Sequence, residues 1–572
     1  MTGPARPAGE PADGPLEGPR VRPGPEPQAT AARPPRGPDL RLLPVAAAAE
    51  LGALGGVALD GAARVALLAV GCLLVSAVLA GVLARELRVR RAGTGRVGPP
   101  RPPGSRALAA VGSASLLGVL VVWASATGIG ALAHHRRDAG PVAALGASGG
   151  SGRVEAVVGA VPRPVTGGGQ PGAVLLDTRV TSLRVGGRTV LVDVPVTALA
   201  DRSWARLGPG TRVSATFRFR PRRGVSSDAA FAVVRGPPTV LGLPGGLRAA
   251  TGRVRAGLAR VSAPLGQPAS GLLPAVVHGD TSGVPAEVTE QFRVSGLAHL
   301  QAVSGANVAV VVVAATAVTV ALGGGRLVST AVGLAAVAGF AVLADLSPPV
   351  VRAGGTAVLV LLGARAAPGR GPALLATAVT VLLLVDPWLA ADVGFALSVS
   401  ATAGILAAGS RFGAALATWL PGPVATAAGI GLAAQSACQP LLTAISGQVG
   451  LVAPFTNLAA EPAVAVATLS GVLAALLATV GGPLGTVAAL GAAAAAEVGG
   501  LACRWLATVA RVGAAAPGAT AGWSATGPGV AAAVLLTAAV LAAGPSVLRH
   551  RRVAIAVAGA LAGLVAGPLV LR

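Results

Sequence analysis

The stretch "AHLQAVSGANVAVVVVAATAVTVAL" at residues 298–322 places a histidine and a few small polar groups ahead of a long uncharged apolar run. A helix needs about 20 apolar residues to cross the roughly 30 Å hydrocarbon core of a bilayer. Similar runs recur along the 572-residue chain, of which 53% is hydrophobic and only 12% is charged. Soluble domains are about 25% charged. The sequence therefore predicts a polytopic α-helical membrane protein.

The apolar segments predict about 12–13 spans. They lie at approximately 43–59, 64–84, 107–132, 299–322, 327–344, 349–364, 372–386, 390–408, 422–445, 452–480, 484–511, 527–545 and 553–570. Residues 1–42 are rich in Pro, Gly and Arg, show no secretory-signal pattern and predict a disordered tail. Residues 43–135 therefore form an N-terminal membrane region, and 299–572 form the main one.

The distribution of charge predicts which side of the membrane each joint faces. The net charge is +23, all 45 basic residues are arginine, and the loop 85–106 holds seven arginines and one acid. Short basic loops face the cytoplasm, so the N-terminal tail is predicted to be cytoplasmic and the C-terminus extracytoplasmic. The basic residues "HHRR" at 134–137 lie at the end of the span that this orientation places outside, so they argue mildly against it. The later connections between predicted spans alternate between ones that contain arginine and ones that contain aspartate. In order, they contain Arg326, Asp345, Arg365 with Arg370, Asp386 and Arg411.

Residues 140–240 differ from the rest, with alternating β-branched residues punctuated by Gly, Pro and Asp. "RVGGRTVLVDV" at 184–194 predicts a hairpin that turns at Gly-Gly. The segment predicts a small inserted β-barrel of the OB type, extracytoplasmic by the orientation above. It contains 13 arginines and 5 acids.

Residues 245–298 predict amphipathic helices rather than spans. The best marked begins near Pro285, has Glu287 early and Arg293 late, and stops at Gly296. The three cysteines, Cys72, Cys438 and Cys503, lie far apart in apolar stretches and are expected to be buried thiols. No phosphate-binding loop with lysine is possible, because the chain has no lysine.

The polar residues of the opening stretch could in principle form an intramembrane serine hydrolase. On an ideal helix Ser304 lies about 140° around the axis from His299, so the two side chains would not face each other. Asn307 lies within about 80° of both, so the three could form one polar strip, with Gly305 allowing close backbone approach. The alternative is a locally satisfied cluster at the start of a helix. No enzymatic activity, cofactor or metal site is expected.

Four ordered motifs resemble the ComEC family of competence proteins. They are "GDTSGVPAEVTEQFRVSGLAHLQAVSGANVAVVV" (279–312), "LSPPVVRAG" (346–354), "DPWLAADVGFALSVSAT" (386–402) and "AAQSACQPLLTAISGQVGLVAPFTNLAAEPAV" (433–464). Ala306-Asn307 replaces the Leu-His of many relatives, a form associated with actinobacterial members. The resemblance covers roughly residues 40–572.

The resemblance implies a channel that imports single-stranded DNA across the bacterial cytoplasmic membrane during natural transformation. Proposed path-lining residues are His299, Ser304, Gly305, Asn307, Arg352, Asp386, Asp392, Gln435, Gln448 and Asn457. Arg352 needs a partner at membrane depth, and Asp386 and Asp392 are the candidates. "TFRFRPRR" (216–223) is the predicted entrance, with Arg218, Arg220, Arg222 and Arg223 binding phosphates and Phe217 and Phe219 facing the barrel core.

Many family members also carry a C-terminal metallo-β-lactamase-like domain. This sequence ends after its last predicted span, and its five histidines are scattered, so any nuclease is expected on a separate chain. Expected partners are single-stranded DNA, membrane lipid, a DNA receptor, and a cytoplasmic motor or single-strand-binding protein. Two alternatives stay open: a transporter of a small solute or lipid-linked sugar, and a membrane enzyme acting at His299–Asn307.

Overall fold

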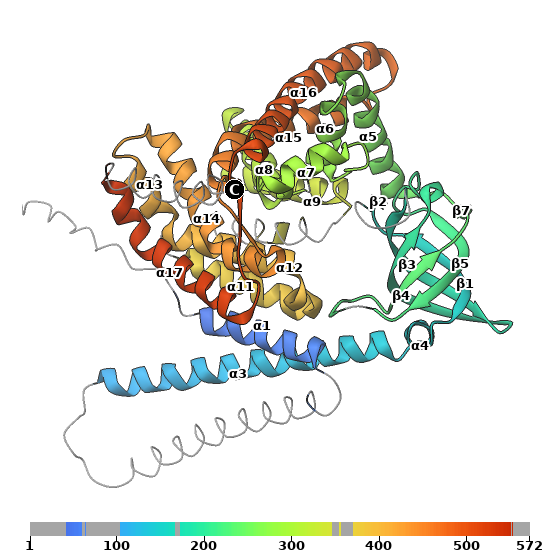
Figure 1. Ribbon diagram of the computed structural model, residues 1–572, viewed down its shortest axis with the longest axis horizontal. Helices are drawn as coiled ribbons and strands as arrows, with labels where there is room; N and C mark the ends of the chain where they lie inside the picture. Colours follow the sequence, from blue (N-terminus) through green and yellow to red (C-terminus); the bar gives the residue numbers. More distant parts are fainter. Residues whose placement is uncertain are drawn as a thin grey trace, which may run out of the picture.

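The computed structural model describes residues 42–59, 103–165, 172–222, 224–301, 303–345 and 370–550, with isolated positions between and beyond these ranges. The molecule is mostly helical, and a β domain is inserted after the N-terminal helices (Figure 1). The segments 64–84, 85–102 and 553–570, together with Cys72, Arg223, Arg352 and most of 349–364, lie outside the described residues.

The two N-terminal helices, α1 (Leu43–Ala58) and α3 (Pro103–Asp138), lie side by side (Figure 1). Their contact is made by glycine, because a Cβ on Gly52 would come within 2.5 Å of the Trp123 carbonyl oxygen. A Cβ on Gly56 would meet the Thr127 carbonyl at the same distance. Small residues let helix backbones approach closely, which is the usual way that helices associate in a membrane.

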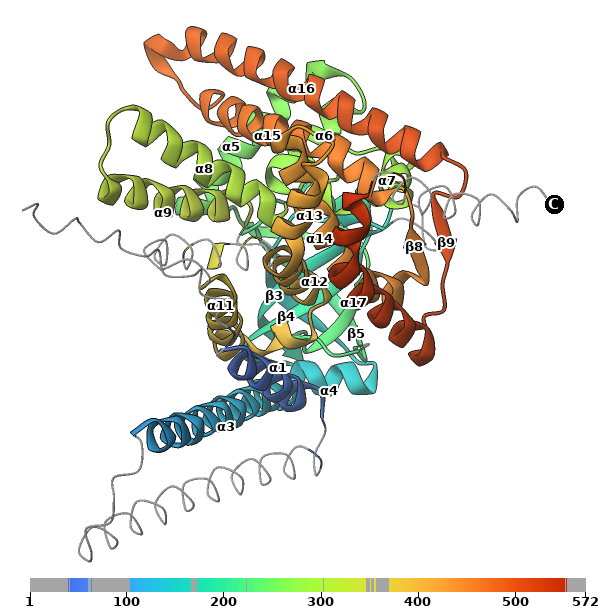
Figure 2. The same ribbon diagram turned by 90° about the vertical axis from the view of Figure 1, so that its left-hand side faces the viewer.

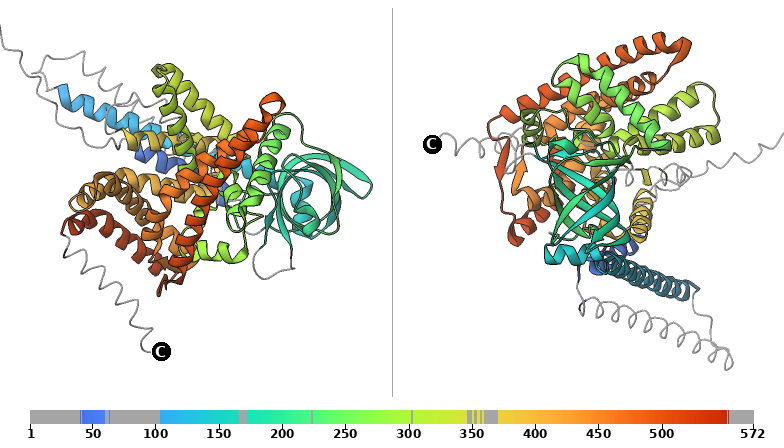
Figure 3. Two further views of the ribbon diagram at one scale, coloured as in Figure 1. Left: turned by 90° about the horizontal axis from the view of Figure 1, so that it is seen from above. Right: turned by 90° about the vertical axis from the view of Figure 1, so that its right-hand side faces the viewer.

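The β domain follows the short helix α4 (Pro141–Ser148). Its strands are β1 (Ser151–Val158), β2 (Arg163–Pro164), β3 (Val174–Val185), β4 (Arg188–Ala200), β5 (Arg212–Arg220), β6 (Ala230–Val234) and β7 (Thr239–Gly242). They form one sheet in the order β1-β3-β4-β6-β5-β7, in which β1 also pairs with β5 and β4 runs parallel to β6. Seen from above, the strands curve round on one side of the helices (Figure 3).

The turn and the core of this domain follow from its sequence pattern. Gly186 and Gly187 form the β3–β4 turn with φ of 56° and 78°, so the predicted Gly-Gly hairpin is confirmed. Phe217 and Phe219 are fully buried, whereas the alternate residues Arg218 and Arg220 are exposed. Trp204 packs edge-on against Phe217 and donates its indole N–H to the Gly236 carbonyl at 2.9 Å.

The central helical core joins the amphipathic region to two long helices. It consists of α5 (Gly246–Ser262), α6 (Ala269–His278), α7 (Ala286–Val294), α15 (Ala453–Leu477) and α16 (Gly485–Ala515), with short 3₁₀ turns at Ala263–Leu265 and Gly482–Leu484. Leu273 of α6 is wedged between α15 and α16, where a Cβ on Gly471 or Gly499 would contact it at 3.0 or 2.8 Å. Glycine at both positions therefore makes room for the leucine.

The remaining helices lie around this core. They are α8 (Gly305–Ala321), α9 (Arg326–Leu343), α11 (Gly371–Val385), α12 (Val393–Gly404), α13 (Ser410–Leu416), α14 (Gly422–Ser446) and α17 (Gly527–Arg549). A 3₁₀ turn, η4 (Pro387–Ala391), joins α11 to α12, and a π-helical turn (Ile405–Gly409) joins α12 to α13. The strands β8 (Gln448–Gly450) and β9 (Thr520–Gly522) form a small ribbon (Figure 2) that the sequence analysis did not predict.

Pro440 lies inside α14 and cannot donate to the carbonyl of Ser436, four residues earlier. Thr537 of α17 supplies the missing donor, since its hydroxyl binds the Ser436 carbonyl at 3.1 Å. Proline is tolerated in membrane helices when a neighbouring helix satisfies the freed backbone group in this way.

Six described helices are long and apolar enough to span a membrane, which supports the prediction of a helical membrane protein. They are Gly118–Asp138, Arg326–Leu343, Val393–Leu416, Ala453–Leu477, Gly482–Ala515 and Gly527–Arg549. The predicted spans near 43–59, 299–322 and 372–386 are helices of 16, 17 and 15 residues, shorter than the roughly 20 residues that a full crossing needs. The predicted 12–13 full crossings therefore exceed what the described part of the chain supports.

The ends of α9 and α15 meet on α5. Arg255 of α5 is buried, donates to the Leu343 carbonyl from Nε at 2.8 Å and pairs with Asp345 just after α9. Two residues later, a Cβ on Gly257 would lie 3.1 Å from Cβ of Ala478, just after α15. If every predicted span crossed the membrane in turn, Asp345 and Ala478 would lie on opposite sides. Both instead lie against neighbouring residues of α5, so this part of the structure does not follow the alternation predicted from the charges.

Candidate functional site

The stretch 276–308 folds as a succession of short elements rather than as one long helix. Gly279 ends α6 in a left-handed conformation (φ 84°), and the Asp280 carboxylate accepts the backbone N–H of Ser282 at 3.0 Å. Helix α7 follows as predicted, and the chain turns at Gly296 (φ 78°), where a Cβ would come within 2.5 Å of Cβ of Ala453. A side chain at 296 would therefore be strained and would clash with α15.

Ser304 and Asn307 form a buried clasp between α8 and α6. The Ser304 hydroxyl donates to Oδ1 of Asn307 at 3.1 Å, and Nδ2 of Asn307 donates to the Val276 carbonyl at 2.9 Å. Through this bond the Asn307 amide holds α8 against α6. Asn307 is only 1% exposed, so its side chain faces no open space. Gly305 begins α8 and is exposed.

His299 lies in a separate 3₁₀ turn, η3 (Ala298–Leu300), where it is exposed. The predicted helix starting at 299 actually begins at Gly305, so the helical angles that related His299 to Ser304 and Asn307 do not apply. The polar strip of three residues is therefore reduced to the pair Ser304–Asn307.

A ladder of neutral polar side chains connects α14 with α15. Asn457 of α15 donates to Gln435 of α14 at 3.3 Å, Gln435 donates to Gln439 at 3.4 Å, and Gln439 donates to the Thr443 hydroxyl at 3.2 Å. The three α14 residues are spaced by four and share one helix face. Sequence analysis named Gln435 and Asn457 and missed Gln439 and Thr443, although their i, i+4 spacing was a visible signal.

Gln448 does not belong to this ladder, because it lies in β8 and pairs with Gly522 of β9. Asp386 and Asp392 begin short helical segments: their carboxylates accept the backbone N–H groups of Trp388 at 3.1 Å and Phe395 at 2.6 Å. Both therefore act as N-caps, which satisfies backbone donors that would otherwise lack partners.

A band of exposed arginines crosses three strands of the β domain. Arg153 of β1 lies directly opposite Arg184 of β3 on one side and opposite Thr216 of β5 on the other. Arg218 and Arg220 follow Thr216 on the same face of β5, and all four arginines are exposed. In the described part of the chain none of the four is ion-paired to an acid. Sequence analysis found only the β5 part of this arginine band, because strand register was needed to find the rest.

Other charged residues of the domain are paired. Asp193 accepts two hydrogen bonds from Arg179, and this guanidinium lowers the pKa of the carboxyl and has its own pKa raised by it. Burial raises the pKa of Asp228. The hydrogen bond that its carboxylate accepts from the Thr197 hydroxyl at 2.8 Å lowers this pKa, but burial has the larger effect.

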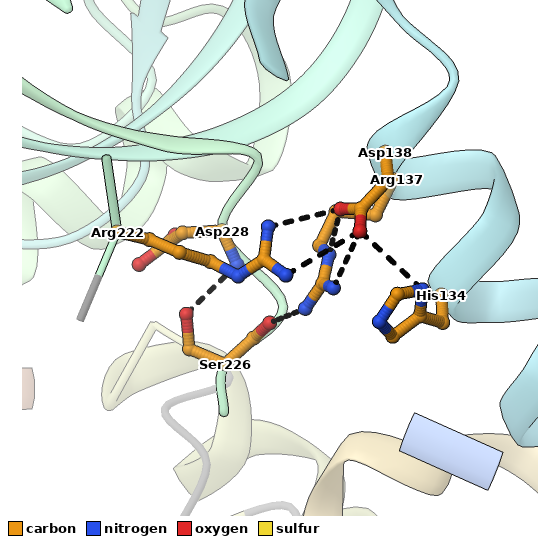
Figure 4. A network of polar contacts seen from close by, with 6 residues as sticks. All are labelled: His134, Arg137, Asp138, Arg222, Ser226 and Asp228. Atoms are coloured by element: carbon orange, nitrogen blue, oxygen red, sulfur yellow. Dashed lines mark hydrogen bonds and ion pairs between the residues drawn. The ribbon is translucent and has the colours of Figure 1, made fainter. Parts of the chain in front are cut away.

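Arg222, a predicted entrance residue, instead belongs to a joint between the β domain and the helices (Figure 4). Its guanidinium pairs at 2.9 Å with Asp138 at the end of α3. Arg137 next to it is buried, binds Asp138 at 2.6 Å and donates to the Ser226 carbonyl at 2.6 Å in the β5–β6 loop. The Arg137 guanidinium also lies 4.4 Å above the Trp388 ring in η4. One arginine thus connects α3, the β domain and the α11–α12 joint.

A comparison with family models places these elements in context. No curated protein and no solved structure matches the chain. Residues 276–547, from the end of α6 through most of α17, match the family model described as "Competence protein", which supports assignment of this region to a competence-protein family.

Proposed function

We propose that the protein conducts single-stranded DNA inward across the cytoplasmic membrane during natural transformation. The observation that carries the proposal is the match of residues 276–547 to the competence family, together with helices able to span a membrane. Natural transformation requires that a strongly charged polymer cross a bilayer, and a polytopic protein with a basic external domain has the parts for that task.

The β domain supplies the entrance in this proposal. Like charges directly opposite in a sheet repel, so Arg153 facing Arg184 costs stability unless an anion neutralises them. A phosphate backbone is such an anion, and Arg218 and Arg220 extend the band along β5. Because Phe217 and Phe219 are buried, binding would rest on phosphate contacts rather than on base stacking.

We also propose that the domain is an OB-like barrel. Support comes from the five strands β1, β3, β4, β6 and β5, whose pairing path returns to β1, and from the parallel β4–β6 pair. Barrels of this kind commonly bind single-stranded nucleic acid.

The polar ladder of Gln435, Gln439, Thr443 and Asn457 is the best candidate for a path lining. Its groups are neutral, so they can hydrogen-bond phosphates and bases without holding them by fixed charge, which suits conduction. Gln435, Gln439 and Asn457 are half-buried rather than fully enclosed. Asn307, by contrast, is committed to its clasp with Val276.

The test uses a transformable bacterium from which the corresponding gene has been deleted and which expresses this chain. Labelled DNA is measured outside the cell and, after nuclease treatment, inside the cytoplasm. We expect the deletion to retain external DNA but lose cytoplasmic arrival, and this chain to restore arrival. Normal arrival in the deletion strain, or no restoration by well-inserted protein, would overturn the proposal. A receptor, a cytoplasmic motor or single-strand-binding protein and a separate nuclease chain remain proposed partners.

A further inference from the structure

The segment between the β domain and the helical core exposes a run of large apolar residues. Val240 and Leu241 of β7, Leu243 just after it and Leu247 in the first turn of α5 are 48%, 46%, 81% and 64% exposed. Neighbouring exposed apolar residues of this kind mark a surface that another apolar phase covers.

Helix α5, which follows at once, has a buried face and a basic face. Arg255 and Leu258 point into the core, where Arg255 holds the end of α9. Arg248, Arg253 and Arg260 are exposed, and on a helical wheel they lie within about 140° of one another. Leu247 and these arginines of α5, with Leu241 and Leu243 just before the helix, have the composition of a segment that lies in a membrane surface.

The position of α5 fits such a role. Arg255 contacts the end of α9, and Gly257 contacts the end of α15, and both are candidate spans. A helix that touches the ends of two spans lies at the depth where spans leave the hydrocarbon. Figures 1 and 3 show α5 beside the β domain, crossing the direction of α3.

We propose that residues 240–260 form an interfacial anchor that binds an anionic lipid leaflet: the leucines enter the acyl region, and Arg248, Arg253 and Arg260 contact headgroup phosphates. The anchor would hold the β domain close to the membrane surface. A nucleic acid would satisfy the arginines but would leave Leu243 and Leu247 uncovered, so lipid is the occupant that fits both halves of the surface.

The first test measures depth in full-length protein reconstituted in nanodiscs. Cys72, Cys438 and Cys503 are replaced by serine or alanine, and a spin label is attached at Leu243→Cys or, as a matched exposed position on the β domain, Thr216→Cys. We expect the label at 243 to be relaxed by oxygen and shielded from a water-soluble nickel complex, and the label at 216 to show the reverse. Equal nickel accessibility at the two sites would overturn the proposal.

The second test measures lipid selectivity. Native mass spectrometry of the wild type in mixed phosphatidylglycerol and phosphatidylcholine should show preferential retention of phosphatidylglycerol. The triple variant Arg248→Gln, Arg253→Gln, Arg260→Gln should retain severalfold less, while Arg153→Gln, Arg218→Gln, Arg220→Gln should match the wild type. Equal loss in both triples, or shielding of the 243 label by a single-stranded oligonucleotide instead of lipid, would refute an anionic-lipid anchor. All six arginines are exposed, so neither triple removes a core contact.

Discussion

Replacing Arg137 by glutamine should release the β5–β6 loop from the end of α3 while leaving both parts folded. The substitution removes the charged donor to the Ser226 carbonyl, 2.6 Å away, and the cation that lies 4.4 Å above the Trp388 ring. Asp138 retains Arg222 as a partner, so no carboxylate is left without a counter-ion. The change therefore acts on the joint between the parts.

The expected loss can be built from its components. A hydrogen bond from a charged group contributes about 1.5–3 kcal/mol. A cation–π contact shielded from water contributes about 2 kcal/mol. Among the described residues, only the hydrogen bond joins Arg137 to the β5–β6 loop, and glutamine recovers part of it as a neutral hydrogen bond. The net loss in docking free energy of the loop should therefore be about 1.5 kcal/mol, or roughly tenfold in the opening equilibrium. The contact with the Trp388 ring stabilises the packing of α3 against η4 instead.

Hydrogen exchange of the full-length protein in nanodiscs measures this opening. Amides of residues 224–229 should exchange about tenfold faster in Arg137→Gln, while amides of β1 and β3 keep wild-type protection. The neighbouring Arg136 is exposed, so Arg136→Gln is the matched control and should leave the loop unchanged. Unaltered exchange in Arg137→Gln would refute the role of the joint. Additive effects of Arg137→Gln and Trp388→Leu would refute the cation–π part.

Three further predictions concern the β domain and the polar ladder. Asp228→Asn should raise the melting temperature at neutral pH and lose this advantage in acid, because the raised pKa of Asp228 means that the native state is stabilised by the protonated carboxyl and loses that stability as pH rises. Asp193→Asn should instead cost under about 1 kcal/mol of stability at neutral pH and nothing well below the lowered pKa of Asp193. Melting temperatures measured against pH check both expectations. Arg153→Gln with Arg184→Gln should weaken binding of single-stranded DNA at low salt and reduce the slope of log affinity against log salt by about 1.4, and an unchanged slope in a titration would count against the arginine band. Gln439→Leu should lower cytoplasmic arrival of DNA severalfold without changing DNA bound outside. The comparison is Thr537→Val, which removes a side-chain hydrogen bond from α17 to α14 outside the ladder.

Local sequence patterns predicted much of the fold. The Gly186–Gly187 turn and the inward Phe217 and Phe219 follow from strand periodicity, which needs no knowledge of the rest of the chain. Most described helices coincide with predicted apolar runs. Their ends were less certain, since α8 begins at Gly305 after a 3₁₀ turn rather than at 299. This shift of six residues decided the site, because it places His299 in the 3₁₀ turn, away from the clasp formed by Ser304 and Asn307.

The tertiary contacts of the site could not be predicted in this way. The "HHRR" motif was interpreted only as a topology signal, yet Arg137 binds a ring at position 388, 251 residues later in the chain. Similarly, the sequence suggested Asp386 and Asp392 as partners for Arg352, but it did not predict that both carboxylates also cap helices. The pairing with Arg352, which lies outside the described residues, stays a prediction. Apolar periodicity shows which face of a helix is buried, but it does not show which neighbour meets that face.

Substitution should separate two classes of arginine in the described part of the chain. Arg137 and Arg255 are buried and donate to backbone carbonyls of other elements, so their loss leaves these acceptors without donors and should lower stability. Arg153, Arg184 and Arg218 are exposed and lack acidic partners among the described residues, so their loss relieves repulsion and should leave stability equal or higher while anion binding falls. The net charge of +23 therefore does not measure how many arginines can bind an anion, because among the described residues it is the exposed, unpaired ones that are available to a polyanion or a lipid headgroup. Arg255→Gln should therefore lower the melting temperature and leave anion affinity unchanged, whereas Arg153→Gln should lower anion affinity without lowering the melting temperature.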